Sequence, residues 1–541
     1  MSNRVGENIS SNSSDSTMGS SLNRRGLLKG AGLLGAGLVL PGGLTACSSN
    51  GQPISPDPVS SGGTPRRGGR LRTGHAGGGS VETLDPATSL TLIDEARARQ
   101  LYDTLTFYSA DMKVVPFLAE RIEPNADASQ FRITLRSGVT FHNNKPLTAD
   151  DVLYTWRRIL DPKTASGGAA ALSRVDMKAT NKVSDTEILV VLNEPQVDFP
   201  ALLTGREQSI IPDGFTDFSN PVGTGPFMFV SFSQGRRSLF KRNPNYWQEG
   251  PYVDELEMIS IPDNTARLNA LVAGQVDAIE NLSYTDARGK QDSATIRVLA
   301  SKSMTCIPFY MQTDVAPFNS PDVRRALRLS VDRESAVKTA LSGFGESGND
   351  LFGKGASMYD NSIEQRPYDP EQAKSLLKKA GAEGLSVTLN TNSGTVGNVE
   401  SCQAFAEQAK GAGINVEVKN WEVGKYNSDI YNQVPFAQTY WNFPPEIMFP
   451  FAMAPTAPYN ETRYSNPQFE TRYAESQRTI DPVKRKDIFD DLQRMLWDDS
   501  GYMIWGFIKF TDATSHNVQG LVEHPYFNLG AFQFRTWWLS A

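Results

Sequence analysis

Residues 117–162 read FLAERIEPNADASQFRITLRSGVTFHNNKPLTADDVLYTWRRILDP. Apolar and polar residues alternate along FRITLRSGVTF, residues 131–141, which predicts a β-strand. The next segment, LTADDVLYTWRRIL, predicts an amphipathic helix with Thr148 as its N-cap. Asp150 and Asp151 would lie in the first turn, where the helix dipole favours negative charge. A strand followed closely by a helix indicates an α/β protein.

The same alternation of strands and helices continues along the chain. Residues 254–280 (DELEMISIPDNTARLNALVAGQVDAIE) predict a strand, a helix and a strand, and residues 385–421 predict a second such unit. Asp332 and Asp369 stand where two further helices would begin, and residues 481–510 predict a long helix that leads into an apolar strand. Because 541 residues are too many for one small core, we expect at least two lobes.

Residues 1–46 have the features of an export signal. Two adjacent arginines (residues 24–25) precede an uncharged, glycine-diluted run over residues 30–46. The pattern resembles a twin-arginine signal peptide, and the LTAC that ends at Cys47 resembles a bacterial lipobox, which implies lipidation of Cys47. Residues 47–68 are rich in Ser, Pro and Gly and predict a flexible tether. The alternative is an uncleaved membrane helix.

Composition and cysteine use limit the classes of function. The net charge of −7 argues against nucleic acid as a partner. The four histidines form no zinc-binding motif, and no catalytic constellation stands out in the sequence. We therefore expect no enzyme activity, no metal and no cofactor. We expect Cys306 and Cys402 to be two separate buried thiols, with a disulfide between them as the alternative in an exported protein.

Four blocks in order along the chain resemble a known family. They are residues 117–162, residues 221–279 (beginning PVGTGPFMFVSFSQGRRSLFKRNPNYW), residues 317–337 (PFNSPDVRRALRLSVDRESAV) and residues 368–381 (YDPEQAKSLLKKAG). Together they resemble the extracellular solute-binding proteins of family 5, the peptide-, oligopeptide- and nickel-binding subunits of ABC importers. The resemblance implies a two-lobed α/β clamp of the type II periplasmic-binding-protein kind, with an extra subdomain in lobe one.

The resemblance also implies the domain organisation. Lobe one would take residues 69–295 and 510–541, with the inserted subdomain at about 106–219, and lobe two would take residues 296–509. A solute would bind between the lobes and be enclosed by closure about a hinge. The implied partner is an ABC permease, and the implied form is a monomer, lipid-anchored to the outer face of the cell membrane.

Peptide binders of the family carry an aspartate in a W-x-x-D-Y-like stretch of lobe two, which pairs with the amino terminus of the ligand. In this sequence Asn442, Phe443 and Pro444 follow the tryptophan, so no aspartate stands there. A buried ammonium group needs an anionic or multiply accepting partner, and Glu446 could supply one only if its loop turns inward. Because of this departure, a more neutral ligand remains an alternative to a free peptide.

Residues on both lobes are candidates for contact with the solute. The resemblance points to Tyr440, Trp441, Asn442, Phe443 and Asn392 in lobe two, and to Ser89 and Thr91 in lobe one. The aromatic side chains would stack or make apolar contacts, and the polar ones would form hydrogen bonds. The alternatives are core packing for the aromatic residues and helix capping for the lobe-one residues.

These features predict the extracytoplasmic solute-binding component of an ABC importer, for oligopeptides or peptide-like solutes. A receptor for a non-peptide solute, such as a sugar or a metal chelate, is the first alternative. A hydrolase attached to the cell surface is the second, and the missing nucleophile–base arrangement argues against it.

Overall fold

The computed structural model describes residues 63–540, apart from residues 78, 456, 458 and 526. The chain divides into two compact units, residues 1–53 and 54–541, and the first lies outside the described residues. In the part of the chain that is described, no helix has both the length and the apolar character needed to span a membrane.

The predicted signal peptide and Cys47 lie outside the described residues, as does most of the predicted tether. The described end of that tether is bonded to the body of the protein. The N–H of Gly68 donates to the carbonyl of Tyr252 at 2.9 Å.

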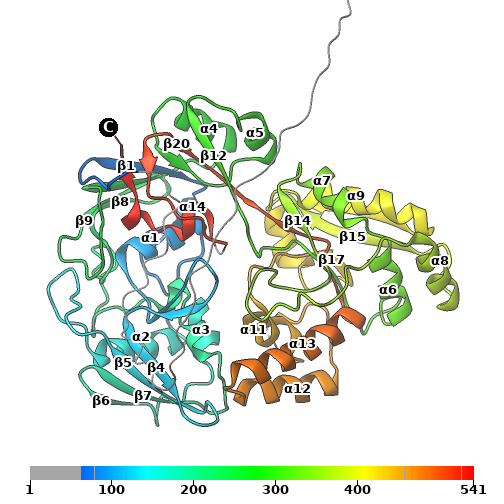
Figure 1. Cartoon of the computed structure of the whole chain (residues 1–541), viewed down its shortest axis with the longest axis horizontal. Coiled ribbons are helices and arrows are strands. Elements are labelled where there is room, and N and C mark those ends of the chain that lie inside the picture. The colour runs from blue at the N-terminus through cyan, green and yellow to red at the C-terminus, as the bar shows by residue number, and fades with distance from the viewer. Residues whose placement is uncertain (1–62, 78, 456, 458, 526, 541) are drawn as a thin grey trace, which may run out of the picture. The chain divides into compact units, whose positions relative to one another are not determined.

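A seven-stranded mixed sheet forms the centre of the first lobe (Figure 1). Its order is β12-β20-β11-β1-β10-β9-β8, in which β1 runs parallel to β10 and β11 and the other neighbours are antiparallel. The order unites strands from the beginning, middle and end of the described chain. The strands are β1 (Arg70–His75), β8 (Phe227–Ser233), β9 (Arg237–Arg242), β10 (Glu255–Ser260), β11 (Ala278–Ile279), β12 (Ile296–Ser301) and β20 (Phe510–Ser515).

Strand β12 begins at the predicted lobe boundary, residue 296. It pairs with β20 along its whole length, from Ile296 opposite Ser515 to Ser301 opposite Phe510. β12 is therefore an edge strand of the seven-stranded sheet. The predicted domain boundaries stay predictions.

The inserted part of the first lobe has a four-stranded antiparallel sheet, in the order β4-β5-β7-β6, covered by α2. These elements are β4 (Ala119–Pro124), β5 (Gln130–Leu135), β6 (Asn181–Ser184), β7 (Glu187–Val191) and α2 (Ala149–Leu160). The predicted helix is confirmed: Asp151 Oδ2 accepts hydrogen bonds from the N–H and the hydroxyl of Thr148 at 2.7 and 2.9 Å. The observed strand β5 ends earlier than the strand predicted over residues 131–141, because Gly138 turns the chain with φ of 78°.

A five-stranded sheet forms the centre of the second lobe, in the order β16-β15-β17-β13-β18. Strands β15 and β16 run parallel with α9 between them in the chain, which confirms the unit predicted at residues 385–421. The strands are β13 (Phe309–Met311), β15 (Ser386–Asn392), β16 (Asn415–Trp421), β17 (Phe436–Gln438) and β18 (Tyr502–Met503).

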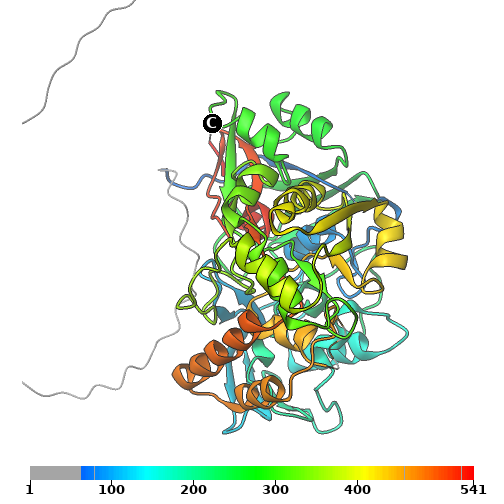
Figure 2. The same ribbon diagram turned by 90° about the vertical axis from the view of Figure 1, so that its right-hand side faces the viewer.

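Helices cover this sheet, and two predicted caps are confirmed. The Asp332 side chain accepts from the N–H of Ser335, and that of Asp369 accepts from the N–H of Gln372. Figures 1 and 2 both show α12 and α13 (orange) packed side by side. The helices of this lobe are α6 (Pro321–Leu329), α7 (Arg333–Ala340), α8 (Pro370–Lys379), α9 (Asn398–Ala409), α12 (Pro467–Arg478) and α13 (Pro482–Asp498).

Shorter elements complete the fold. The helices are α1 (Leu92–Leu101), α3 (Phe199–Leu202), α4 (Asn264–Val272), α5 (Tyr284–Gly289), α10 (Val423–Lys425), α11 (Pro445–Met448) and α14 (Asn528–Ala531). The strands are β2 (Thr106–Tyr108), β3 (Val114–Pro116), β14 (Gly345–Ser347), β19 (Gly506–Ile508), β21 (Val518–Gln519) and β22 (Trp538–Leu539). The short 3-10 helices are η1 (Gly79–Val81), η2 (Gly167–Leu172), η3 (Arg206–Gln208), η4 (Lys410–Ala412) and η7 (Phe534–Thr536), and the π-helices are η5 (Tyr426–Ile430) and η6 (Phe449–Met453).

The chain crosses between the two lobes twice after β12. Residues 302–308 connect β12 of the first lobe to β13 of the second. The return is a single residue, Lys509, because β19 pairs with β14 while β20 pairs with β12. Away from these connections an ion pair joins Asp198 of the first lobe to Arg485 on α13.

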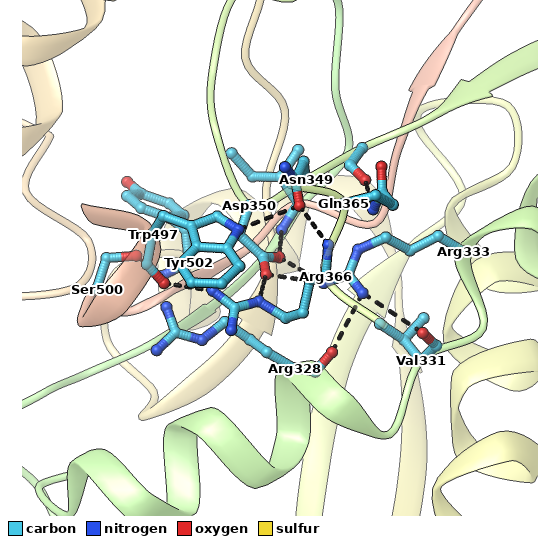
Figure 3. Close-up of polar contacts among 12 residues, drawn as sticks. Arg328, Val331, Arg333, Asn349, Asp350, Gln365, Arg366, Trp497, Ser500 and Tyr502 are labelled. Atoms are coloured by element: carbon cyan, nitrogen blue, oxygen red, sulfur yellow. Dashed lines mark hydrogen bonds and ion pairs between the residues drawn. The ribbon is translucent and has the colours of Figure 1, made fainter. Parts of the chain in front are cut away.

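A buried charge cluster holds the second lobe together (Figure 3). The Asp350 carboxylate accepts from Arg333 Nη2 at 2.8 Å, from Arg366 Nε at 2.6 Å and from the N–H of Ile504 at 3.0 Å. Burial alone would raise the pKa of Asp350, but attraction to Arg333, Arg366 and Arg328 outweighs it, so this pKa lies below its ordinary value. Burial, together with repulsion from Arg366, lowers the pKa of Arg328 to about 9.

Candidate ligand-binding site

A cavity of about 350 Å³ lies between the lobes. Side chains of both lobes line it, among them Glu95, Arg99, Arg206, Glu207 and Gln208 from the first and Tyr440, Asn442, Phe443, Ile447 and Phe451 from the second. A second cavity of about 320 Å³ adjoins it, since Tyr440 and Phe527 line both. We call the two together the interlobe cleft.

The segment from Tyr440 to Phe443 is bonded to the connection between the lobes. The N–H of Trp441 donates to the carbonyl of Cys306 at 3.0 Å, and the N–H of Cys306 donates back to Trp441 at 2.9 Å. Tyr440, 47% exposed, and Asn442 line the cleft, whereas Trp441 packs in the core of the second lobe. Core packing therefore accounts for Trp441. Tyr440, Asn442 and Phe443 border the cleft, and their contact with a solute stays a prediction.

A buried carboxylate, Glu461, fixes the ring of Trp441. The Nε1 of Trp441 donates to Glu461 Oε2 at 3.2 Å, and the hydroxyls of Tyr502 and Thr439 donate to the same carboxylate at 2.8 and 2.7 Å. Burial raises the pKa of Glu461, although hydrogen bonds from Tyr431, Thr439 and the other donors oppose that rise. These bonds fix the orientation of the Trp441 ring.

Ser89 and Thr91 have partners within the first lobe. Thr91 is the N-cap of α1, where its Oγ1 accepts from the N–H of Asp94 at 3.3 Å. Ser89 Oγ accepts from Arg206 Nε at 2.8 Å, and the Ser89 carbonyl accepts from Arg206 Nη2 at 3.0 Å. The capping alternative therefore describes Thr91, and Ser89 positions an arginine that lines the cleft.

Four charged residues of the first lobe form one network in the cleft wall. Glu95 accepts from Arg99 Nε at 2.7 Å and from Arg206 Nη1 at 3.1 Å, and Arg206 also pairs with Glu207 at 3.2 Å. Burial alone would raise the pKa of Glu95, but attraction to Arg99 and Arg206 outweighs it and lowers this pKa. Two guanidinium groups balance two carboxylates, so the network has no net charge.

Comparison with known proteins identifies the family. The sequence profile described as Bacterial extracellular solute-binding proteins, family 5 Middle, matches residues 113–458. This chain belongs to that family. Two curated relatives are the glutathione-binding protein GsiB of Pectobacterium atrosepticum, 24% identical over 83% of this chain, and the di/tripeptide-binding protein 2 of Pseudomonas aeruginosa, 26% identical over 82%. This chain covers 91% of each relative.

Solved structures of family members share the fold. DppA of Helicobacter pylori, in complex with the peptide STSA, superposes with a TM-score of 0.74 at 23% identity, covering 88% of this chain and 99% of DppA. AppA of Bacillus subtilis, in complex with a nonapeptide, gives a TM-score of 0.73 at 22% identity, covering 88% of this chain and 100% of AppA. The predicted two-lobed α/β clamp of the type II periplasmic-binding-protein kind is thereby confirmed. Members of the family are extracytoplasmic proteins that bind solutes.

Asn392 ends β15 beside the second cavity of the cleft. Its Oδ1 accepts from the N–H of Gly394 at 2.7 Å, which turns the chain into residues 393–396. Those residues line the cavity that Tyr440 also borders. The structure therefore gives Asn392 a turn-forming bond, and its contact with a solute stays a prediction.

Glu446 does not replace the missing aspartate in the cleft with Tyr440. It lines another interlobe cavity of about 360 Å³, together with Asp198 and Arg485, and that cavity meets the cleft at Ala201. Burial and, next, repulsion from Asp198 raise the pKa of Glu446 to about 7. The neighbouring Ile447 faces the cleft instead, so α11 separates the two cavities.

Sequence reasoning missed Glu95, Arg99, Arg206 and Glu207. One signal in the sequence marks the first pair: in LIDEARARQL, residues 92–101, the charged residues spread over more than half of the helix circumference, which is wider than one narrow polar stripe. In the structure most of this helix is buried, and its charges are paired. Buried charges must be paired or they destabilise the fold, so such a pattern predicts an internal network.

The cysteine prediction is confirmed, because Cys306 and Cys402 are buried free thiols. Among the described residues, no group of three or more His, Cys, Asp or Glu side chains could hold a metal ion.

Proposed function

We propose that this chain is the solute-binding component of an ABC importer, and that it captures an oligopeptide or peptide-like solute in the interlobe cleft. The cleft walls come from both lobes, with the charged network of Glu95 and Arg206 on one side and Tyr440 and Phe443 on the other. This is the observation that carries the proposal. Two of its curated relatives are named for glutathione and for di- and tripeptides, which are peptide-like solutes.

Closure about the two crossings is part of the proposal. A solute that contacts both lobes binds the closed form better than the open form, so it shifts the population toward closure. The partner would be an ABC permease that recognises the closed form. The protein would act as a monomer that binds the solute without transforming it.

The export and anchoring of the protein also belong to the proposal. The twin-arginine-like signal over residues 1–46 would direct export, and Cys47 would carry the lipid that holds the protein at the outer face of the cell membrane. Several acyl chains give durable anchoring, since each buried methylene contributes about 0.8 kcal/mol. Metabolic labelling with a radioactive fatty acid tests this, because Cys47→Ser should abolish incorporation.

Binding and closure can be tested on one protein preparation. Thermal unfolding of the full chain is measured against peptides of two to nine residues, sugars and metal chelates. A solute at one hundred times its Kd should stabilise the protein by about 2.7 kcal/mol. Small-angle scattering should then show a smaller radius of gyration with that solute. Stabilisation by a sugar or chelate alone would replace the peptide proposal, and turnover of a peptide would restore the hydrolase alternative.

A further inference from the structure

The turn η3 places two hydrogen-bond acceptors in the wall of the interlobe cleft. Glu207 keeps 22% of its side chain exposed and lines the cleft, and Gln208 lines it as well. The Gln208 amide is oriented because its Nε2 donates to the carbonyl of Gly168 at 3.1 Å. Its Oε1 is buried and has no hydrogen-bond partner among the described residues. A buried acceptor without a partner costs about 1–3 kcal/mol, which a donor on a ligand would recover.

Gly168 permits this arrangement. A Cβ on Gly168 would lie 2.6 Å from the Cβ of Glu207 and 2.8 Å from Nε2 of Gln208. A side chain at position 168 would therefore crowd both Glu207 and Gln208.

The nearby cations are already engaged by protein acceptors. Arg206 donates to Ser89 and Glu95 and pairs with Glu207, and Arg99 donates to Glu95 and to the carbonyl of Thr204. Glu95 receives both guanidinium groups and is almost fully buried. Glu207, in contrast, pairs with Arg206 at 3.2 Å and is partly exposed, so it can accept further donors from the cleft.

Across the cleft the second lobe offers no carboxylate from the segment that follows Trp441. Asn442 and Phe443 line the cavity there, and Pro444 comes next. Glu446 lines a different cavity, on the other side of α11. A cationic group in the cleft would therefore find its carboxylate on the first lobe.

We propose that Glu207 and the Oε1 of Gln208 bind a primary ammonium group of the solute. This inference rests on the proposed function and adds to it the chemical class of the recognised end. An ammonium group has three donors and one positive charge, which match a carboxylate and an amide oxygen on consecutive residues of one turn. The solute then contacts the first lobe through its ammonium group and the second lobe through Tyr440 and Phe443.

The test uses the full chain and alanine peptides of two to five residues, each with a free and with an acetylated amino terminus. Acetylation removes the charge and two donors while the rest of the peptide is unchanged. We expect free-amino peptides to bind about 10- to 100-fold more tightly than their acetylated partners, as measured by calorimetry. In Glu207→Gln and Gln208→Met the affinity for free-amino peptides should fall, and that for acetylated peptides should not. Glu371→Gln, an exposed carboxylate on α8, is the matched control.

Each outcome decides the inference. If the wild-type protein binds the free and the acetylated peptides with equal affinity, the inference is wrong and the proposed function still stands. This comparison needs no variant. If Glu207→Gln keeps the preference for free amino groups, the ammonium group binds elsewhere in the protein, and the inference is also wrong. If neither series binds, the proposed function fails for this class of solute, and the inference fails with it.

Discussion

Replacing Asp350 by asparagine should strongly destabilise the second lobe. The carboxylate receives Arg333 at 2.8 Å and Arg366 at 2.6 Å, and Arg328 lies buried beside them (Figure 3). Asparagine keeps the size of the side chain and tolerates the positive φ of 58° at this position, so neither a cavity nor backbone strain contributes. The substitution changes the charge of the side chain. The new amide nitrogen at position 350 faces guanidinium donors, and three buried arginines lose their counter-ion.

Removing one partner of a buried ion pair costs about 3–5 kcal/mol in the free energy of unfolding. Urea unfolding, followed by tryptophan fluorescence, measures this. With an m value of about 3 kcal/mol/M, the midpoint should fall by about 1 M or more. Since the pKa of Asp350 lies below its ordinary value, its ionised form stabilises the wild type above the unfolded pKa, and this contribution fades as the pH falls through the folded pKa.

The control is Glu371→Gln, because Glu371 makes an exposed ion pair with Lys374. Surface changes of this kind alter stability by less than about 0.5 kcal/mol. If Asp350→Asn costs no more than this control, the arginines do not depend on Asp350, and the reasoning from charge compensation is wrong.

Three further outcomes are expected. Between about pH 4.5 and 7, Glu446 should keep its proton in the folded state only, so wild-type stability should fall by up to about 3 kcal/mol as the pH rises. Urea unfolding across this range should show a smaller fall in Glu446→Gln, and equal slopes would contradict the assignment. Thr148→Ala removes a hydroxyl bonded to Asp151 and should cost about 1 kcal/mol of unfolding free energy in the same assay; no loss would refute its capping role. Burial raises the thiol pKa of Cys306 and Cys402, so in the Cys47→Ser variant Ellman's reagent should label these two only after unfolding, and labelling of that native variant would contradict their burial.

Local patterns predicted the elements well where the deciding contacts are local. The helix after Thr148 and the parallel unit over residues 385–421 follow from periodicity and capping alone. The strand over 131–141 was too long, since apolar alternation continues past Gly138 although its φ of 78° turns the chain. The pairing of β12 with β20 is a tertiary contact that no local signal in the sequence marks.

The candidate site was predictable on one lobe and not on the other. Tyr440 and Phe443 lie in the stretch that resembles the W-x-x-D-Y-like stretch of the family, and both border the cleft. Glu95 and Arg206 are 111 positions apart, so their pairing depends on how α1 and η3 meet in three dimensions. The charged residues of α1 predict only that an internal charge network exists. They do not predict which residues elsewhere in the chain complete it.

The position of the 440–443 segment connects solute contact with closure. Trp441 exchanges two backbone hydrogen bonds with Cys306, which belongs to the 302–308 crossing, and Phe507 bridges to Cys306 near the second crossing at Lys509. The 440–443 wall is thus bonded directly to the first crossing and is linked to the residues before the second one through Cys306. Under the proposed function, a solute that contacts both Tyr440 and the charged wall of the first lobe would bind more tightly when the two walls approach, which is the differential affinity that closure requires. Loosening the Glu461 bonds that fix Trp441 should weaken this coupling even though Glu461 itself lies in the core of the second lobe.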